Sequence, residues 1–415
     1  MQSSPIHRGR WPTFGDAWTC PPEIPDADWK PMVTLRPSYM QVKPGDTARD
    51  RWRDFDLILF VTMLVLMGFG ILAIWSAVGL PPLTTMNNGT FQALLGALGI
   101  VILLITASID YRFLNTLAWP LYGIGVLALI SVQTFGVELG GARNWFDFGF
   151  FLLQPAEFVR ITTLLALASF IASREDDMRS FVNFLTSGLI VALPAGLVLI
   201  GPDLGMAMVY VAIWASTLLV MRTRFLYIVL VLISLPVLGW IAWQFVLEDY
   251  QKIRFKVSFT PEIAPLAEGF QILQARISIG AGGLWGEGLA GGTQSQLNLL
   301  SVRDSDFIFA HASGMFGFVG MLGLFLALAI FLWRCLKVAE IARDQFGQVL
   351  AVGIAGVLFF QAFLNIGMNV GVMPVTGITL PFVSYGLSSL WSNLILVGIL
   401  QSIRMHHRKL AFIRP

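Results

Sequence analysis

The residue in this sequence best placed to do chemistry is Asp306, which opens a long apolar segment in Arg303-Asp-Ser-Asp-Phe-Ile-Phe-Ala310. A carboxylate at the edge of an apolar region can take a proton from an incoming hydroxyl group. Asp304, Ser305 and Asp306 are also residue types that cap helix N-termini, so capping is the alternative interpretation. The sequence leaves both interpretations open.

A second group of polar residues occurs in Gln154-Pro-Ala-Glu-Phe-Val-Arg160, where Pro155 suits the first turn of a helix. Glu157 and Arg160 are three residues apart, so they share a helix face and can pair. Arg143 lies shortly before them, in Gly140-Gly-Ala-Arg-Asn-Trp145. We interpret these residues either as the polar wall of a cavity or as an ion pair that locks two helices together.

Two further groups of polar residues lie within or between apolar segments. Asp203, in Pro202-Asp-Leu-Gly205, separates two apolar segments and is expected either to cap a helix or to bind a sugar or cation. The stretch from Asn365 to Gly386, which includes Ser384, combines Pro, Gly and polar residues inside apolar sequence. Such backbone must be buried in protein or line a cavity, although small residues also allow close helix packing.

A glycine-rich stretch stands out between these features. Residues 269–280 have an amphipathic pattern that predicts a helix along the membrane interface. Residues 280–288 then contain five glycines in nine positions, which suits either a sharp bend, a close approach to a ligand or a flexible surface loop. No Gly-Lys-Ser/Thr follows, so this stretch is not a phosphate-binding P-loop.

The elements that must position these residues are membrane-spanning helices. Of the 415 residues, 56% are hydrophobic and only 13% are charged, too few to cover a soluble domain. Because about 20 apolar residues cross a bilayer, we predict an all-α polytopic membrane protein of about ten transmembrane helices. The expected spans are 55–78, 91–107, 113–134, 148–172, 182–200, 204–221, 225–247, 307–334, 347–370 and 378–402.

The distribution of Lys and Arg in the short loops predicts the orientation. It places both termini in the cytoplasm and a long extracytoplasmic loop at 247–306, between the seventh and eighth helices. Residues 1–54 are expected to be a largely disordered cytoplasmic tail, residues 55–403 the transmembrane domain, and residues 404–415 a cytoplasmic tail. Cys20 and Cys335 then face the reducing side, and no disulfide is expected.

In this topology the polar features from distant parts of the chain all lie toward the outer leaflet. A transporter would concentrate its polar site near the bilayer midplane. The arrangement therefore favours an enzyme whose lipid-borne substrate is displayed on the outer surface. No basic tract interleaved with aromatic residues is present in the sequence, and nucleic acid is not an expected partner.

Over residues 55–405 the sequence resembles the SEDS family (shape, elongation, division and sporulation), and within it the RodA branch rather than the division paralogue FtsW. Many motifs occur in family order. They are Gly141-Ala-Arg143 with Trp145, Gln154-Pro155 with Glu157, Pro202–Gly205, Gly269–Ile272, Ile279-Gly280 with Gly282-Gly283, Gly292–Leu297, Asp306–Ala310, Asn365–Met368, and Pro381 with Ser384-Tyr-Gly386.

The resemblance implies an enzyme that polymerises lipid II into glycan strands during cell-wall elongation in the bacterial plasma membrane. It implies as partners a class B penicillin-binding protein, which crosslinks the strands, and other membrane proteins of the elongation complex. The family's essential aspartate falls on Asp306. The substrate-binding positions that we expect, by resemblance or by charge, are Arg143, Gln154, Glu157, Arg160, Asp203, Arg254, Arg303 and Ser384.

The chemistry fits these residues. Asp306 would act as base or orient the acceptor 4-hydroxyl, and the displacement would invert the donor carbon. Arginines bind phosphate oxygens bidentately, so Arg143, Arg160, Arg254 and Arg303 are candidates to hold the diphosphate. A divalent cation, Mg²⁺ or Mn²⁺, would help the diphosphate to leave.

The sequence also departs from the family pattern. The usual Glu pair is replaced within His311-Ala-Ser-Gly-Met315, the usual Leu-Pro-Glu by Leu300-Ser-Val302, and the usual Lys by Arg160. We expect His311 to be a helix-packing residue. Two other functions stay open: a lipid II flippase, and a non-catalytic scaffold that activates a transpeptidase.

Overall fold

The structure is a computed structural model of the 415-residue chain. It describes residues 48–82, 85–139, 142–149, 151–174, 177–221, 223–246, 249–264, 268–289, 291, 297, 299–300 and 302–407. These residues belong to one compact unit, Gly45–Lys409. Residues 1–47 of the predicted tail 1–54, and the end of the chain after residue 407, lie outside the described residues.

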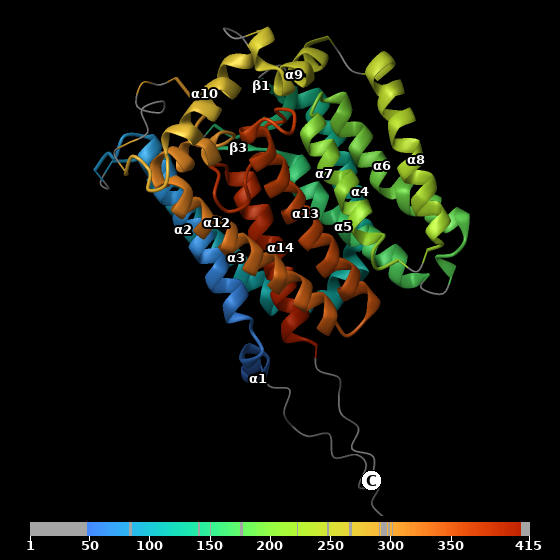
Figure 1. Cartoon of the computed structure of the whole chain (residues 1–415). Helices are drawn as coiled ribbons and strands as arrows, with labels where there is room; N and C mark the ends of the chain where they lie inside the picture. The colour runs from blue at the N-terminus through green and yellow to red at the C-terminus, as the bar shows by residue number, and fades with distance from the viewer. Residues whose placement is uncertain are drawn as a thin grey trace, which may run out of the picture. The chain divides into compact units, whose positions relative to one another are not determined.

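The unit is a helical bundle whose long helices run up and down between two ends (Figure 1). Their order along the chain matches the ten predicted spans. The long helices are α2 (Leu57–Ala77), α3 (Asn88–Ser108), α4 (Tyr111–Phe135), α5 (Pro155–Ser173), α6 (Phe181–Ile200), α7 (Leu204–Thr217), α8 (Phe225–Ile241), α12 (Ile308–Ile341), α13 (Gln345–Val370) and α14 (Leu387–Met405).

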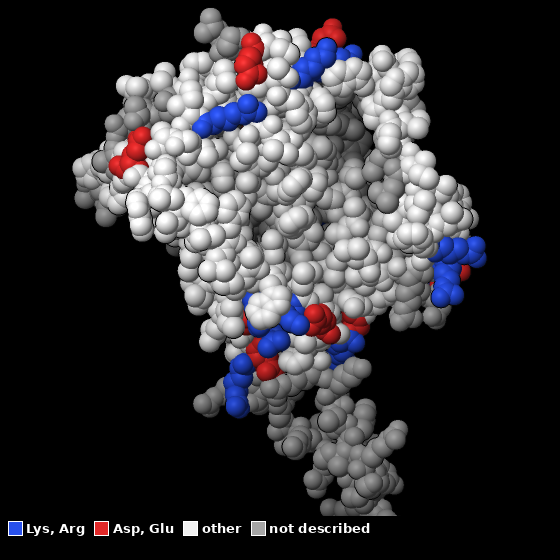
Figure 2. Space-filling model, viewed as in Figure 1, with Lys and Arg blue, Asp and Glu red and all other residues white. Residues whose placement is uncertain are grey.

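Seven of these described helices are long and apolar enough to cross a membrane. The other three are α7 and α8, which are shorter, and α14, which is rich in Ser and carries Asn393 and Gln401. The all-helical, multi-pass membrane fold is therefore confirmed. Charged side chains gather toward two ends of the face in Figure 2, and an uncharged band separates them. Such a band is the expected surface toward lipid.

Shorter elements join the long helices. Before α2 lies α1 (Ala48–Arg53), so the predicted tail boundary at 54/55 falls just after a helix. The predicted outer loop at 247–306 contains helices, among them the expected amphipathic one. These elements are α9 (Asp249–Phe259), η4 (Pro261–Ile263) and α10 (Glu268–Ala281), and η3 (Ala242–Val246) lies between α8 and the loop. Packing of α10 against α12 and α13 shows that much of its surface meets protein.

The fourth and tenth spans begin later than predicted. Before α5 lies a small antiparallel sheet of order β1-β2-β3, made of β1 (Val137–Leu139), β2 (Ala142–Asp147) and β3 (Leu152–Leu153). Residues 378–386 are a non-helical loop before α14. Hydropathy alone cannot distinguish such short apolar stretches from helix ends.

A break in α12 explains the glycine-rich stretch. Gly317 has φ 63° and ψ −169°, which interrupts the helix. The backbone of residues 283–288 pairs with the break: Glu287 N donates to Gly314 O over 2.9 Å, and Phe318 N donates to Gly283 O over 2.9 Å. Side chains at 286 and 317 would collide with the facing backbone. The stretch is therefore a fixed backbone insert, and the flexible-loop interpretation is wrong.

Helices α5 and α13 lie at the centre of the bundle, beside α14, most of whose residues are also buried. In both α5 and α13, 72% of the most apolar window is buried, more than in the other five apolar spans. Buried polar residues on these two helices, such as Glu157, Arg160, Asn365 and Asn369, point to neighbouring elements. The two central helices therefore carry polar groups to the end of the bundle where α12 and α14 begin.

Candidate active site

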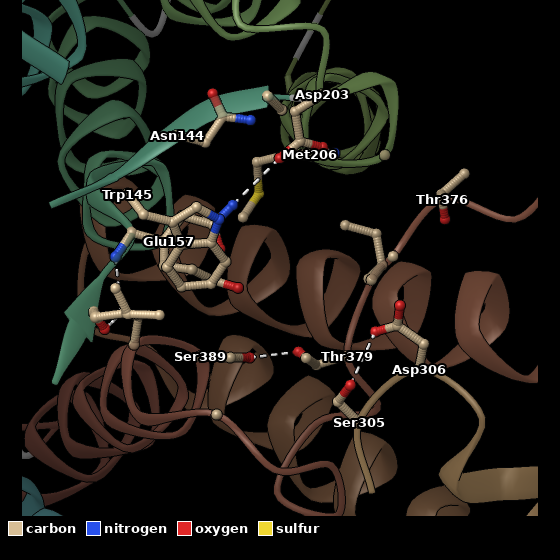
Figure 3. Close-up of a pocket in the computed structure, with 18 of the residues that line it drawn as sticks. Asn144, Trp145, Glu157, Asp203, Met206, Ser305, Asp306, Thr376, Thr379 and Ser389 are labelled. Atoms are coloured by element: carbon tan, nitrogen blue, oxygen red, sulfur yellow. Dashed lines mark hydrogen bonds between the residues drawn. The ribbon is translucent and has the colours of Figure 1, made fainter. Parts of the chain in front are cut away.

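Residues at one end of the bundle line a cavity of about 1020 Å³. The elements that supply them, among them the small sheet and the start of α5, lie at the end opposite to α1 (Figure 1). The cavity is enclosed by β2, the starts of α5, α7 and α14, the turn before α12, and the loop at 374–379. Four of the predicted site residues line it: Gln154, Glu157, Asp203 and Asp306. Figure 3 shows Asp306 across an open space from Glu157 and the β2 residues, with Asp203 at the side.

The backbone of Asp306 is held by α13. The side-chain amides of Asn365 and Asn369 donate to the Asp306 carbonyl oxygen over 3.1 and 3.0 Å. The Ser305 hydroxyl donates to Asp306 Oδ1 over 3.3 Å. The N-cap position of α12 is Phe307, with no side-chain cap. The capping interpretation of Asp306 is therefore wrong, and its carboxylate faces the cavity.

Asp203 has the predicted capping role, and its position also leaves the predicted role in substrate binding open. It caps α7 by accepting a hydrogen bond from Met206 N over 2.9 Å, and it lines the cavity. Gln154 Nε2 donates to Asp203 Oδ2 over 3.2 Å. Burial in the turn between α6 and α7 raises the pKa of Asp203 to about 6. The Met206 amide lowers this pKa, and the charges of Glu157 and Asp306 raise it.

Glu157 and Arg160 form the predicted ion pair. Arg160 Nη2 lies 2.8 Å from Glu157 Oε2, and both side chains are almost fully buried. The same nitrogen donates to Ser392 Oγ and Asn393 Oδ1 of α14, each over 2.7 Å. The pair therefore joins α5 to α14, as the helix-locking interpretation expected. Glu157 also borders the cavity, whereas Arg160 is not among the residues that line it.

Three other predicted site residues, Arg143, Arg303 and Ser384, are not among the residues that line this cavity. Arg143 is exposed and faces Glu138 across the β-hairpin, with 3.7 Å between Nε and Oε2. Arg303 borders a smaller neighbouring cavity of about 420 Å³. The Ser384 hydroxyl is buried and donates to Ser305 O over 2.7 Å. Arg254 lies on α9, but its side chain is outside the described residues.

The arginines expected to hold the diphosphate are thus not found in the described part of the lining. The lining residues given by the structure include the acids Asp147, Glu157, Asp203 and Asp306, but no Lys, Arg or His. Within the described residues, no three His, Cys, Asp or Glu side chains gather closely enough to hold a metal ion. His311 is buried in α12 and its ring Nε2 lies 3.1 Å from Ala73 O, which confirms the helix-packing interpretation.

Sequence reasoning missed several residues that line the cavity. Asn144 and Trp145 belong only to a motif in the sequence analysis, Thr376 and Thr379 lie in the broken segment 365–386, and Ser389 was not singled out at all. The Thr379 and Ser389 hydroxyls are 2.6 Å apart. The interruption of apolar sequence by Pro and Gly was the signal for the loop, but no signal showed which of its side chains face the cavity.

Comparison with known proteins identifies the family. The family model for FtsW, RodA and SpoVE, described as cell cycle proteins, matches residues 56–409. The chain belongs to the FtsW/RodA/SpoVE family. Within this family it is 35% identical to the peptidoglycan glycosyltransferase MrdB of Escherichia coli K12, over 86% of this chain and 95% of that protein. It is 30% identical to the peptidoglycan glycosyltransferase RodA of Treponema pallidum, over 84% and 97%.

Solved structures of the FtsW/RodA/SpoVE fold agree with this. A chain from a peptidoglycan synthase complex that coordinates polymerisation and crosslinking superposes with a TM-score of 0.73 at 28% identity, covering 85% of this chain and 98% of that one. The crystal structure of RodA from Thermus thermophilus superposes with a TM-score of 0.65 at 26% identity, covering 86% and 99%.

Proposed function

We propose that this chain is a peptidoglycan glycosyltransferase that polymerises lipid II during cell-wall elongation, with Asp306 acting on the acceptor hydroxyl. The observation that carries the proposal is the position of Asp306. Its carboxylate borders a cavity of about 1020 Å³ at one end of a membrane bundle, and two asparagines fix its backbone. Relatives that match over most of this chain are named for the same activity.

In the proposed reaction, Asp306 accepts the proton of the acceptor 4-hydroxyl as its oxygen attacks the anomeric carbon of the donor. The bond from that carbon to the diphosphate oxygen breaks, and undecaprenyl diphosphate leaves. A single displacement inverts the anomeric carbon. Glu157 lies across the cavity from Asp306 and Asp203 lies at its side, where both can accept hydrogen bonds from sugar hydroxyls.

The diphosphate needs positive charge that the described lining does not supply. We propose Arg254 for this role, because its neighbour Phe255 borders the cavity. Arg303 and Arg143 lie at the same end of the bundle. Arg160 is better suited to positioning Glu157, since it is enclosed by α5 and α14. A divalent cation would need only one or two protein carboxylates in addition to phosphate oxygens. Asp306, Asp203 and Glu157 are carboxylates in the cavity lining that could bind it.

The cavity is proposed to open on the extracytoplasmic side. Many Lys and Arg residues lie at the opposite end, in or beside short connections, as expected for the cytoplasmic side. They include Arg51, Arg53, Arg112, Arg174, Arg179, Arg224, Arg334, Lys337, Arg343 and Arg404. We further propose a class B penicillin-binding protein as partner, consistent with the similarity to a chain of a peptidoglycan synthase complex.

The test is polymerisation of lipid II by the purified chain in proteoliposomes, with and without its partner and Mg²⁺ or Mn²⁺. We expect glycan polymer, and a loss of about 10²- to 10⁴-fold in turnover for Asp306→Asn. The matched control is Asp304→Asn, two residues away, where the carboxylate accepts from Asn88 over 2.7 Å. Lipid II translocation without polymer would favour a flippase, and restoration of rod shape by Asp306→Asn would favour a scaffold.

A further inference from the structure

Asn144 is a buried polar residue in the cavity wall that the proposed reaction does not use. Its exposed fraction is 8%, and it is one of the residues that line the cavity. Its side-chain amide makes no hydrogen bond to another described residue, and the polar atoms of the amide are open to the cavity. An amide in this position can exchange its hydrogen bonds to water for hydrogen bonds to a ligand.

The strand geometry explains why Asn144 faces inward. Neighbouring strand residues normally point to opposite faces. In β2 the register shifts: Trp145 pairs with Val137, whereas Arg143 pairs with Glu138, the next residue of β1. Asn144 is therefore the extra residue of a β-bulge. Bulges redirect side chains and are frequent beside active sites. Here the bulge allows both Asn144 and Trp145 to line the cavity while Arg143 points to solvent.

The neighbouring turn leaves room for this arrangement. The Asn144 amide lies directly against Gly201, where a side chain would collide with it. Figure 3 shows the amide directed to the same space as Asp203, with Trp145 beside it on the strand. A planar amide, an aromatic side chain and the Gln154–Asp203 pair thus border one region of the cavity. The lining described there includes acids but no basic group, so this region does not suit the diphosphate.

We infer that Asn144 and Trp145, presented by the bulge in β2, form a subsite for an N-acetylated hexosamine ring of the substrate. This inference rests on the proposed function, because it names the part of the lipid-linked sugar that this wall receives. The Asn144 amide donates to the acetamido carbonyl oxygen. Trp145 covers an apolar face of the sugar or the acetamido methyl group. Asp203 and Gln154 bind ring hydroxyls.

The test compares lipid II with two analogues, in each of which one acetamido group is replaced by a hydroxyl. We expect wild-type kcat/KM to fall about five- to tenfold for one analogue, as for loss of one hydrogen bond. Asn144→Ala should lose a similar factor on lipid II, mainly through KM, and should no longer distinguish that analogue. Asn144→Ser, a smaller polar change, serves as the second variant if Asn144→Ala does not accumulate.

Gln133→Leu is the matched control. Gln133 is an amide residue beside the same glycine but outside the cavity lining, where it donates to Leu197 O over 3.3 Å. It should retain wild-type discrimination between lipid II and the analogues. Equal use of lipid II and both analogues by the wild type, or undiminished discrimination in the Asn144 variants, would overturn the subsite and leave the polymerase intact. No polymer from wild-type chain and lipid II would instead overturn the proposed function itself, and the subsite with it.

Discussion

The side-chain amide of Asn369, on α13, donates to the backbone carbonyl oxygen of Asp306 over 3.0 Å. The carbonyl oxygen of the same amide accepts from Ala310 N, in the first turn of α12, over 3.1 Å. One fully buried side chain therefore fixes both the position of Asp306 and the start of the helix that follows it. Asn365 reinforces this link and also donates to Ile378 O in the cavity loop.

Asn369→Leu, which keeps the size of the side chain but removes its hydrogen bonds, should lower kcat about 10- to 100-fold with little change in KM. The physical reason is that a small misplacement of the acting carboxylate is costly in the transition state. Steady-state kinetics on lipid II measure both constants. The control is Gln361→Leu on the same helix, because the buried Gln361 amide has no described partner to lose. A Gln361 variant as impaired as Asn369→Leu would contradict the positioning role.

The raised pKa of Asp203 predicts that turnover decreases on the acidic side of the pH–rate profile. This pKa, raised to about 6 by burial, means that the carboxylate becomes protonated as pH falls through 6. If the charged form binds substrate, turnover should fall below about pH 6, and Asp203→Asn should reduce that decrease. The stability effect has the opposite sign. Because the folded-state pKa lies above the ordinary value of 3.8, the folded state binds more protons and gains stability as pH falls from about 6 toward 3.8.

Measurements of the thermal unfolding temperature over the same pH range test the predicted gain in stability on acidification. Asp203→Asn should unfold at a higher temperature than the wild type at neutral pH, since it removes a buried charge beside Glu157 and Asp306. It should also lose the wild-type gain on acidification. A wild type whose unfolding temperature is unchanged between pH 7 and 5, or which tracks the variant, would show that Asp203 titrates at its ordinary pKa.

The ion pair of Glu157 and Arg160 predicts a non-additive effect on stability. Arg160→Met leaves the Glu157 carboxylate buried without its cation and should cost about 3–5 kcal/mol of unfolding free energy. Adding Glu157→Gln should recover much of this loss, because no buried charge then remains. Thermal unfolding of the detergent-solubilised proteins ranks the stabilities of the wild type, Arg160→Met and the double variant. A double variant less stable than Arg160→Met alone would mean that the pair is not electrostatically coupled.

The sequence predicted the helices well because about 20 apolar residues are a strong and local signal. It predicted three of the four described carboxylates that line the cavity, Glu157, Asp203 and Asp306, because ionisable residues beside apolar segments are costly and usually mark a cavity or pathway. It could not predict the direction of Arg143, which depends on its pairing with Glu138 across the hairpin. Nor could it predict Asn144, whose orientation follows from the register of two short strands. Cross-strand register and loop conformation depend on tertiary packing.

The glycine-rich stretch shows a similar limit. Five glycines in nine residues indicated unusual backbone, but the partner of that backbone is a helix break some 30 residues later in the chain, at Gly317. Neither part carries a residue pattern that identifies the other. Only the folded structure shows that the insert supplies hydrogen bonds to backbone groups that a broken membrane helix would otherwise leave unsatisfied.

This pairing predicts which glycines cannot be replaced. Gly317→Ala places a side chain at φ 63° and against the backbone of residues 284–286, so it should cost about 2 kcal/mol or more of unfolding free energy. Gly286→Ala, at φ 78° and against Met315 O, should behave alike. Gly323→Ala, in the same helix with open space at its Cβ position, should be neutral or slightly stabilising because alanine favours helix. The thermal unfolding temperatures of the three variants, and their levels of accumulation in the membrane, measure the cost of each substitution. Equal stability of Gly317→Ala and Gly323→Ala would show that the insert does not hold the break together.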